Sequence, residues 1–519
     1  MIEQVYNFSL DVTWQLIQKM SRLDRFDAQW TTIEKREGQS LKQLKSIATV
    51  RSVGASTRIE GSKMTSIWYL VWVTILIHSM RLCNSCHNTM RRVFLLIFIL
   101  FALNVAAQNA DQRIGELINN ANWFALADEY PHLKDSMQVE FLKPMAESLI
   151  AKYFNQPEKA IEAMTTLLSK YQEDIGASSA LNFALLRLQM IGEQGKYAEA
   201  ADGLKAIAEQ LPQVPAVQSL YQHYNALRNF PALSVTRPDA DVTIPFQLQL
   251  PKVHKREEWM RTGRKQFKGY LMTIPVTCHG KQQSFIFDTG ASATFIKESI
   301  AKEWGLTILP DTILLNGNQK SLQAYIDSLQ IGGIVCRNMI VYVGLSNPLD
   351  TLVSGVDAVL GMDFIKAVGE TQILFDKQHI VFPQKPTVSA RRPNILLDGT
   401  LIMQARKDGV PLSLILDTGF TTAELYNDYY TKFAAEVDAN AEPDTITTGT
   451  YGHVITSRIL LLPRISFSVG SKHITMEEMN LYPNDDNPLA NYDGRMGMDL
   501  IRRFKKTTIN LNDMFVDFE

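Results

Sequence analysis

The sequence predicts a multidomain protein in which an all-α helical domain precedes an all-β domain made of two repeated lobes. From Asp111 to about Phe230 the chain is rich in Ala, Leu, Glu and Gln, and its apolar residues recur at helical spacing. Beyond residue 242, short alternating runs separated by glycine-containing turns are typical of strands. One short pattern occurs twice within this β-rich part. At 519 residues the chain is also too long for a single core.

Composition narrows the range of partners. The chain has 52 basic and 54 acidic residues and a formal net charge of -2, so we expect no nucleic-acid partner and no attraction to an anionic membrane surface. Its four cysteines are too few for a disulfide framework. Cys278 and Cys336 lie in the part that we expect to be exported, and they either pair or remain as two buried thiols.

A secretory signal peptide is predicted at residues 90–107. Arg91 and Arg92 precede an apolar run, and small residues end the segment at Ala107. We therefore expect translation to start at Met90, with residues 1–89 spurious or absent from the mature protein. We expect that product to be periplasmic or secreted, without a membrane anchor unless the apolar stretch at residues 65–80 is retained.

Two motifs lie upstream of the predicted signal peptide. Residues 23–26 and 56–61 resemble the amino-terminal part of Fic-family adenylyltransferases over residues 1–64, but no His-Pro-Phe signature follows, so we expect a fragment without adenylylation activity. Residues Cys83, Cys86 and His87 match the pattern for covalent haem attachment. Because this pattern precedes the signal peptide, we expect no haem. We also expect no other cofactor and no metal.

The helical domain is expected to span residues 108–235. Ala160, Ile161, Met164 and Leu167 have helical spacing, and the segments 155–160 and 195–200 each open an amphipathic helix. These two openings resemble those of tetratricopeptide-type hairpins. The domain then either holds a protein partner or the substrate, or is a spacer packed against the β-rich part. A linker is expected at residues 236–264 because of its prolines and aspartates.

The repeated pattern contains the residues suited to catalysis. Residues 285–290 and 414–419 are apolar runs that end in Asp-Thr-Gly, with the aspartates at Asp288 and Asp417. A turn glycine precedes each run, at Gly280 and Gly409, which predicts a hairpin. Two further glycine segments follow in the same order in both halves, at residues 331–333 and 359–365 and again at 469–471 and 495–501.

This pattern favours catalysis by a pair of carboxylates. An apolar strand that runs into Asp-Thr-Gly presents a carboxylate on a tight loop, which glycine permits. Two such carboxylates about 3 Å apart share one proton, so one member acts as a base and the other as an acid. A water molecule between them can then attack a peptide carbonyl without a metal or a covalent intermediate.

Residues 265–388 and 389–519 resemble two retropepsin-type lobes joined in one chain, an arrangement that pepsin-like enzymes also have. The resemblance implies a double-lobed acid-protease fold and an aspartic endopeptidase that acts on peptides or proteins, with Asp288 and Asp417 as its catalytic residues. It also implies that Thr289 and Thr418 bond across to the opposite loop. Further expected loop residues are Gly290, Ser292, Gly419 and Thr421, and the segments at Gly361 and Gly497 are expected to pack beneath the loops.

Two further features are predicted: hairpin flaps over the site, and one loop position at which the two lobes differ. Hairpin flaps are expected with tips at Gly317 in lobe one and at Gly449, Tyr451 and Gly452 in lobe two. The residue directly after Asp-Thr-Gly is Phe420 in lobe two, whereas it is the small residue Ala291 in lobe one. Phe420 either lines a substrate pocket or crowds the two aspartates. The alternative function is therefore a catalytically silent protein that binds peptides.

Overall fold

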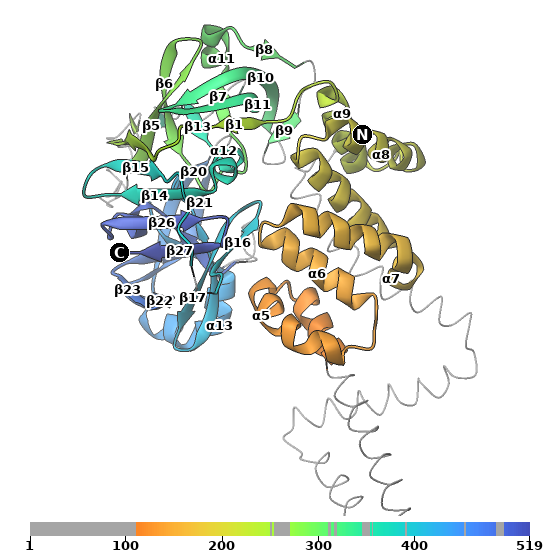
Figure 1. Cartoon of the computed structure of the whole chain (residues 1–519). Coiled ribbons are helices and arrows are strands. Elements are labelled where there is room, and N and C mark those ends of the chain that lie inside the picture. Colours follow the sequence, from red (N-terminus) through yellow and green to blue (C-terminus); the bar gives the residue numbers. More distant parts are fainter. Residues whose placement is uncertain are drawn as a thin grey trace, which may run out of the picture. The chain divides into compact units, whose positions relative to one another are not determined.

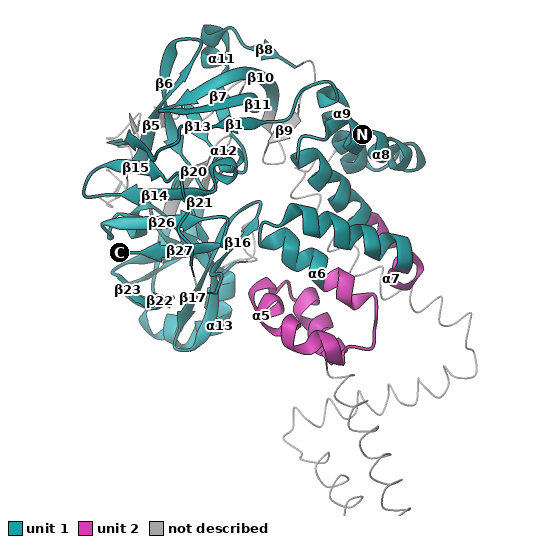
Figure 2. Cartoon of the chain, in the orientation of Figure 1, with its two compact units in different colours: residues 1–15, 147–170, 182–519 teal, residues 16–146, 171–181 magenta. Residues whose placement is uncertain are grey.

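The computed structural model describes residues 110–249, 252–253, 270–309, 313–315, 319–344, 353–354, 357–389, 392–450, 453–483 and 492–519. The predicted Fic-like fragment, haem motif and signal peptide all lie outside these residues. The described chain divides into two compact units, one of residues 110–146 and 171–181 and the other of residues 147–170 and 182–519 (Figure 2). None of the described helices is both long enough and apolar enough to cross a membrane.

The amino-terminal part is helical, as predicted. Ala160, Met164 and Leu167 are fully buried, and Ala160 and Met164 share a core with Ala151, Leu186 and Met190. Two helices start where the sequence predicts, at Pro157 and Tyr197. After a helical stretch at residues 110–119, the helical elements are α5 (Trp123–Leu133), η1 (Lys134–Ser136), α6 (Leu142–Tyr153), α7 (Pro157–Glu193), α8 (Tyr197–Gln210) and α9 (Pro215–Leu227) (Figure 1).

Lobe one is a closed β-barrel. Its strands run in the order β11-β7-β13-β6-β5-β10, and β10 pairs again with β11. The barrel strands are β5 (Leu271–Cys278), β6 (Lys281–Phe287), β7 (Phe295–Lys297), β10 (Gln319–Ile331), β11 (Ile334–Gly344) and β13 (Ala358–Leu360). The remaining elements are α11 (Glu298–Trp304), β8 (Thr307–Ile308), β9 (Ile313–Leu315), α12 (Met362–Val368) and a short pair, β4 (Lys252–Val253) with β12 (Val353–Ser354).

Lobe two repeats this topology with interrupted strands. The long strand β10 corresponds to β21 and β22 in succession, and β11 corresponds to β23 and β24, because β21 pairs with β24 and β22 pairs with β23. The strands are β16 (Ile395–Asp398), β17 (Thr400–Lys407), β18 (Val410–Leu416), β19 (Glu424–Leu425), β20 (Glu442–Thr450), β21 (His453–Leu462), β22 (Ile465–Val469), β23 (Lys472–Met476), β24 (Met479–Leu481) and β25 (Gly494–Met496). The helices are α13 (Asn427–Asn440) and α14 (Met498–Ile501).

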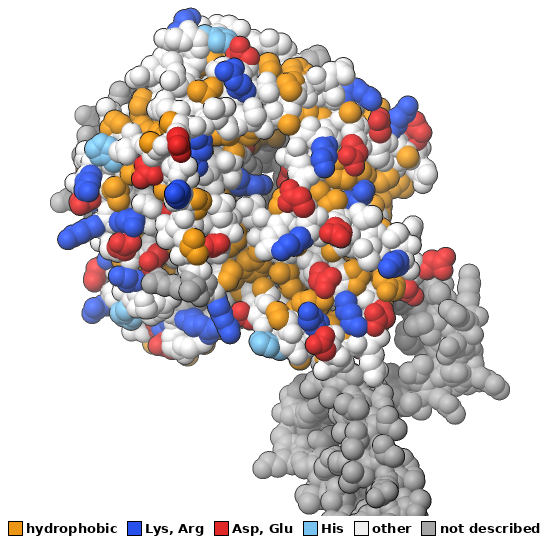
Figure 3. Space-filling view, in the orientation of Figure 1, with side chains coloured by type: hydrophobic (Ala, Val, Ile, Leu, Met, Phe, Trp, Pro, Cys, Tyr) orange, Lys and Arg blue, Asp and Glu red, His pale blue; other side chains and the backbone are white. Residues whose placement is uncertain are grey.

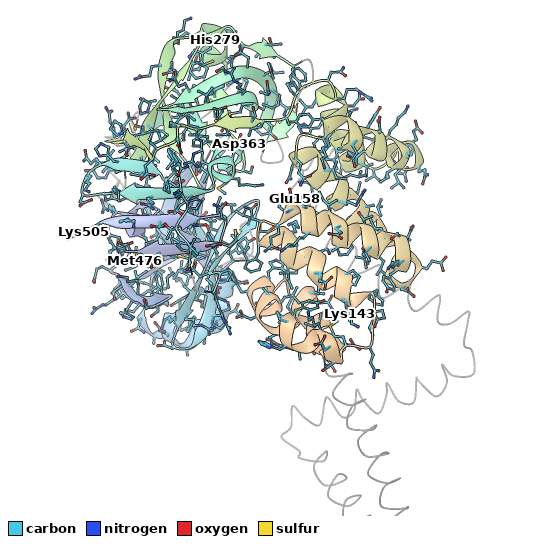
Figure 4. All side chains as sticks on the ribbon, viewed as in Figure 1. Lys143, Glu158, His279, Asp363, Met476 and Lys505 are labelled. Atoms are coloured by element: carbon cyan, nitrogen blue, oxygen red, sulfur yellow. The ribbon has the colours of Figure 1, made fainter. Side chains whose placement is uncertain are left out.

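The predicted hairpin precedes each Asp-Thr-Gly strand. Strand β5 turns into β6 through His279 and Gly280, whose φ angles are 49° and 76°. Strand β17 turns into β18 through Asp408 and Gly409, with φ angles of 51° and 82°. Two consecutive positive φ angles define the tight turn that suits the twist of a hairpin, and glycine adopts them at no steric cost. His279 lies at the outer end of lobe one, away from Asp363 (Figure 4).

A separate five-stranded sheet joins the two lobes. Strand β14 (Glu370–Leu374) of lobe one pairs along its whole length with β26 (Lys506–Asn510) of lobe two. The sheet continues on either side in the order β2-β15-β14-β26-β27, with β2 (Val242–Pro245), β15 (His379–Phe382) and β27 (Phe515–Phe518). Both lobes therefore rest on one continuous hydrogen-bonded sheet.

The predicted linker at 236–264 needs correction in its first half. Strand β2 belongs to the sheet between the lobes, while β1 (Ser234–Thr236) and β3 (Gln247–Gln249) pair with lobe-one strands β11 and β5. Val242, Ile244 and Phe246 are buried and alternate with exposed residues, which is the signal of a half-buried strand. The prolines and aspartates obscured this alternation.

The expected domain boundary near residue 235 also does not divide the compact units. The side-chain amide of Asn155 donates to the Leu511 carbonyl oxygen over 2.9 Å, and the ring of Phe230 lies 5.0 Å from that of Tyr325. Arg237 donates to the carbonyl oxygens of Val368, Phe382 and Pro383. These contacts attach turns that follow α6 and α9, and the segment at Arg237, to the β lobes.

Cys278 and Cys336 are free and buried. Both lie opposite Leu329, one on each side of β10, so about two strand spacings separate their backbones and exceed the reach of a disulfide. Burial raises the pKa of Cys278 to about 11 and that of Cys336 to about 12. Both side chains are therefore unreactive core thiols.

Candidate active site

The Asp288 and Asp417 loops begin at equivalent points of the two lobes. Strand β6 pairs in parallel with β13, and β18 pairs in parallel with β25. At the end of each pair, the backbone N–H of the aspartate donates to the neighbouring strand, from Asp288 to Leu360 over 3.0 Å and from Asp417 to Met496 over 2.9 Å. The parallel pairing fixes the point at which each aspartate leaves its strand.

Two threonines join the loops across the lobes. The Thr289 N–H donates to Thr418 Oγ1 over 2.9 Å, and the Thr418 N–H donates to Thr289 Oγ1 over 3.0 Å. Each hydroxyl then donates to a carbonyl oxygen of the opposite lobe, Thr289 to Leu416 and Thr418 to Phe287, over 2.6 Å in both cases. Both side chains are fully buried, so this symmetrical set of bonds positions one loop on the other.

The glycines allow the two carboxyl groups to approach each other. Gly290 N–H donates to Asp288 Oδ1 over 2.7 Å, and Gly419 N–H donates to Asp417 Oδ1 over 2.9 Å. A Cβ atom on Gly290 would lie 2.3 Å from Asp417 Cγ, and one on Gly419 would lie 2.2 Å from Asp288 Cγ. Each glycine therefore faces the carboxyl group of the opposite lobe, and only hydrogen leaves room for it.

Asp288 and Asp417 form one coupled pair. Burial raises the pKa of Asp288 well above the usual aspartate range, and the charge of Asp417 and a hydrogen bond with it raise that pKa further. The N–H groups of Gly290 and Ala291 act in the opposite direction. Asp417 is also buried, with 6% of its surface exposed. Two carboxyl groups this close in a buried site share one proton.

The later glycine segments lie directly beneath the loops. The Met362 N–H donates to the Ala291 carbonyl oxygen, and the Met498 N–H donates to that of Phe420, over 2.8 Å in both lobes. A Cβ atom on Gly361 would lie 2.5 Å from the Ala293 carbonyl oxygen, and one on Gly497 would lie 2.5 Å from that of Phe420. These segments support the two Asp-Thr-Gly loops through backbone contacts that require glycine.

Two aspartates in these segments were not recognised from the sequence as part of the site. Asp363 accepts from the N–H of Thr294 over 2.9 Å and from its hydroxyl over 2.7 Å. Asp499 accepts from the Ala423 N–H over 2.8 Å in the other lobe. Both hold the chain just after an Asp-Thr-Gly loop. Their recurrence in the two Gly-Met-Asp segments was the available signal.

A charged cluster beside Asp417 was also missed. Arg495 Nη1 lies 3.3 Å from Asp417 Oδ2, and Arg495 Nη2 lies 2.7 Å from Glu424 Oε1. The guanidinium group lies over the Phe420 ring, 3.5 Å from its centroid. Phe420 thus packs against Arg495, and its ring supports a cation beside the dyad. The available signal was a charged residue in a segment that is apolar in lobe one.

The other residues predicted for the site either lie away from the two carboxyl groups' hydrogen bonds or fall outside the described residues. Ser292 is exposed, and Thr421 Oγ1 lies 3.4 Å from the Thr422 hydroxyl. Gly317, Tyr451 and Gly452 lie outside the described residues, whereas Gly449 lies in β20. The strands on either side of both expected tips form antiparallel pairs, β9 with β10 and β20 with β21.

One family model and several solved structures are similar to parts of this chain. Residues 274–367 match the family model described as "gag-polyprotein putative aspartyl protease". Among solved structures, a retropepsin-like aspartic protease from Rickettsia conorii is similar at 18% identity over 29% of this chain and 91% of that chain, with a TM-score of 0.18. The aspartic proteinase from Irpex lacteus is similar at 11% identity over 53% of this chain and 96% of that chain, with a TM-score of 0.33. No curated protein matches the chain in sequence.

Two barrels that meet at paired Asp-Thr-Gly loops above a shared sheet define the fold of the retropepsin-like and pepsin-like aspartic proteases. The protein has this fold, as predicted, and the family match lies within its first lobe. Both aspartates belong to one chain, so the two halves of the site form without a second copy.

Proposed function

We propose that the protein is an exported aspartic endopeptidase that hydrolyses peptide bonds between Asp288 and Asp417. The main observation in favour of this function is that the two buried carboxyl groups lie close together, each opposite the glycine of the other loop. Such a pair retains one proton at a pH where ordinary aspartates are fully ionised, which supplies an acid and a base at one point.

The proposed reaction uses a water molecule held between the carboxyl groups. The ionised carboxylate removes a proton from the water, whose oxygen attacks the peptide carbonyl carbon, and the protonated partner gives its proton to the carbonyl oxygen. The resulting gem-diol collapses as the first carboxyl group passes its proton to the amide nitrogen and the C–N bond breaks. One gem-diol hydroxyl returns its proton to the second carboxylate. The products are a carboxylic acid and an amine, and the dyad is restored.

Export is part of the proposal. It rests on the predicted signal peptide at residues 90–107, and it places the enzyme in the periplasm or outside the cell, where its substrates are peptides or unfolded proteins. Acidic and basic side chains are intermixed on the face drawn in Figure 3. A mixed surface of this kind suits proteins of varied charge better than a strongly charged partner.

Cleavage by the full chain tests the proposal. Labelled, unfolded casein is incubated with the wild type and with Asp288→Asn and Asp417→Asn, from acid to neutral pH and with a pepstatin-type inhibitor. We expect the wild type to cleave, each substitution to lower the rate by at least about a thousandfold, and the inhibitor to block the remainder. A folded wild type that cleaves nothing at any pH would favour the silent peptide-binding alternative.

A further inference from the structure

The two lobes differ at three equivalent positions around the dyad. Strands β7 and β13 place Phe295 opposite Val359 in lobe one, whereas β19 and β25 place Glu424 opposite Arg495 in lobe two. Val359 pairs in parallel with a residue of β6, and Arg495 pairs in the same way with a residue of β18. Two apolar residues of lobe one are thus replaced by an ion pair in lobe two.

The third difference supports the same ion pair. Ala291 and Phe420 occupy equivalent loop positions, because each accepts from the N–H of the methionine in its own Gly-Met-Asp segment. Only Phe420 presents a ring, and Arg495 lies on it at 3.5 Å. Arg495 therefore has an aromatic surface on one side and two carboxylates at its edges.

The contacts give Arg495 a fixed orientation. Glu424 Oε1 accepts from both Nε, at 3.2 Å, and Nη2, at 2.7 Å, and the Tyr426 hydroxyl donates to the same oxygen over 2.6 Å. Nη1 is then directed at Asp417 Oδ2. The pKa of Arg495 is raised despite burial, because the carboxylates of Glu424 and Asp417 stabilise its positive charge. A planar guanidinium group held at one edge presents its other edge with little loss of entropy.

We propose that Arg495 is a positioning residue that keeps the negative charge of the dyad on Asp417 and thereby fixes Asp288 as the proton donor. Both oxygens of Asp417 then accept from donors, Oδ1 from the Gly419 N–H and Oδ2 from Arg495. At Asp288, Oδ1 accepts from two backbone N–H groups, and the residue equivalent to Arg495 is Val359. This inference rests on the proposed function, because it assigns the base and the acid of that reaction.

The charges around the dyad agree with this assignment. Among the residues that the structure describes, the titratable and charged groups around Asp417 are Asp288 from the loop after β6, Arg495 from β25, and Glu424 and Tyr426 at β19. Arg495 is the cation among them, and it contacts Asp417 directly. Burial and the Asp417 charge also raise the pKa of Asp288, which is the direction expected for a proton donor.

The first test is the pH dependence of kcat/KM for casein cleavage by full-length Arg495→Met. Without the guanidinium charge, the midpoint of the acid limb is expected to move up by about one pH unit or more, with roughly a tenfold loss of rate on that limb. Arg495→Lys keeps a positive charge, so its acid-limb midpoint should lie between those of the wild type and Arg495→Met. Arg406→Met is the control, because Arg406 is exposed and donates to the Gly409 carbonyl oxygen of its own hairpin. An equal loss at every pH, or a change in KM alone, would overturn the inference and make Arg495 a residue that shapes the substrate pocket.

The second test does not require activity. Aspartate carboxyl carbons of the full chain are labelled with ¹³C, and the two dyad signals are assigned with Asp288→Asn and Asp417→Asn. We expect one carboxylic-acid signal, at Asp288, and one carboxylate signal, at Asp417, with the difference reduced in Arg495→Met. A proton on Asp417 in the wild type would contradict the assignment. If the wild type cleaves nothing, the proposed function fails, and this measurement still decides the role of Arg495.

Discussion

At the scale of single residues, Asp288 and Asp417 have identical motifs but different surroundings. Asp288 Oδ1 accepts from two backbone N–H groups, of Gly290 and Ala291. Asp417 Oδ1 accepts from the Gly419 N–H, while the Phe420 N–H donates instead to the Asp417 carbonyl oxygen over 3.3 Å. Arg495 provides the missing donor on the other carboxylate oxygen. The repeated sequence thus produces a site that is symmetrical in its backbone and asymmetrical in its charges.

The raised pKa of Asp288 predicts a dependence of stability on pH. A carboxyl group whose pKa is higher in the folded state contributes stability below its unfolded pKa of about 4, and that contribution is lost as the pH rises through the folded value. Asparagine keeps the Oδ1 acceptor and cannot ionise. We expect Asp288→Asn to raise the melting temperature at pH 7 by at least about 2 °C and to have little effect near pH 3. Thermal unfolding at both values checks this, and an equal loss of stability at the two would contradict it.

The proposed catalytic residues, Asp288 and Asp417, were predictable because the sequence repeats their motif, but the cluster around Arg495 was not. Glu424 and Arg495 are 71 residues apart, and strand register alone brings them together. The sequence showed that Phe420 differs from the small residue of lobe one, and it left two roles open: lining a substrate pocket or crowding the two aspartates. Neither role included the guanidinium group that covers its ring, because the distance in sequence concealed that contact.

At the scale of elements, the pairing of the two loops depends on Thr289 and Thr418. Their four hydrogen bonds are buried and connect β6 of one lobe with β18 of the other. Strand and turn signals predicted the hairpins before each loop. Residues 242–249 were assigned to the linker, although they begin the β-rich part, because their alternation is short and close to prolines.

Thr418→Val tests the energetic weight of this connection. The substitution keeps the shape of the side chain but leaves the Thr289 N–H and the Phe287 carbonyl oxygen without their partner. Each buried group left unsatisfied costs about 1–3 kcal/mol, so we expect a loss of at least about 2 kcal/mol. Thr418→Ser is the matched control, because it retains the hydroxyl group. Denaturant unfolding measures both variants, and equal stability of the two would show that the hydroxyl bonds contribute little.

At the scale of the whole molecule, the lobes are joined in three ways. They share the β14–β26 pairing, the threonine bonds and the covalent connection of one chain. The sequence predicted the two lobes and their order. It did not predict that β2, from before lobe one, would enter the sheet between the lobes, because pairing across the whole chain is not encoded in local pattern.

The central claim is that one chain contains one complete site made of Asp288 and Asp417. The most direct test is cleavage of unfolded casein by the wild type, by Asp288→Asn and Asp417→Asn separately, and by an equimolar mixture of the two variants. We predict that the wild type cleaves, that each variant is inactive and that the mixture is also inactive, because neither chain holds both carboxyl groups. Activity in the mixture would mean that the site forms between two chains, and activity in either single variant would contradict the dyad itself.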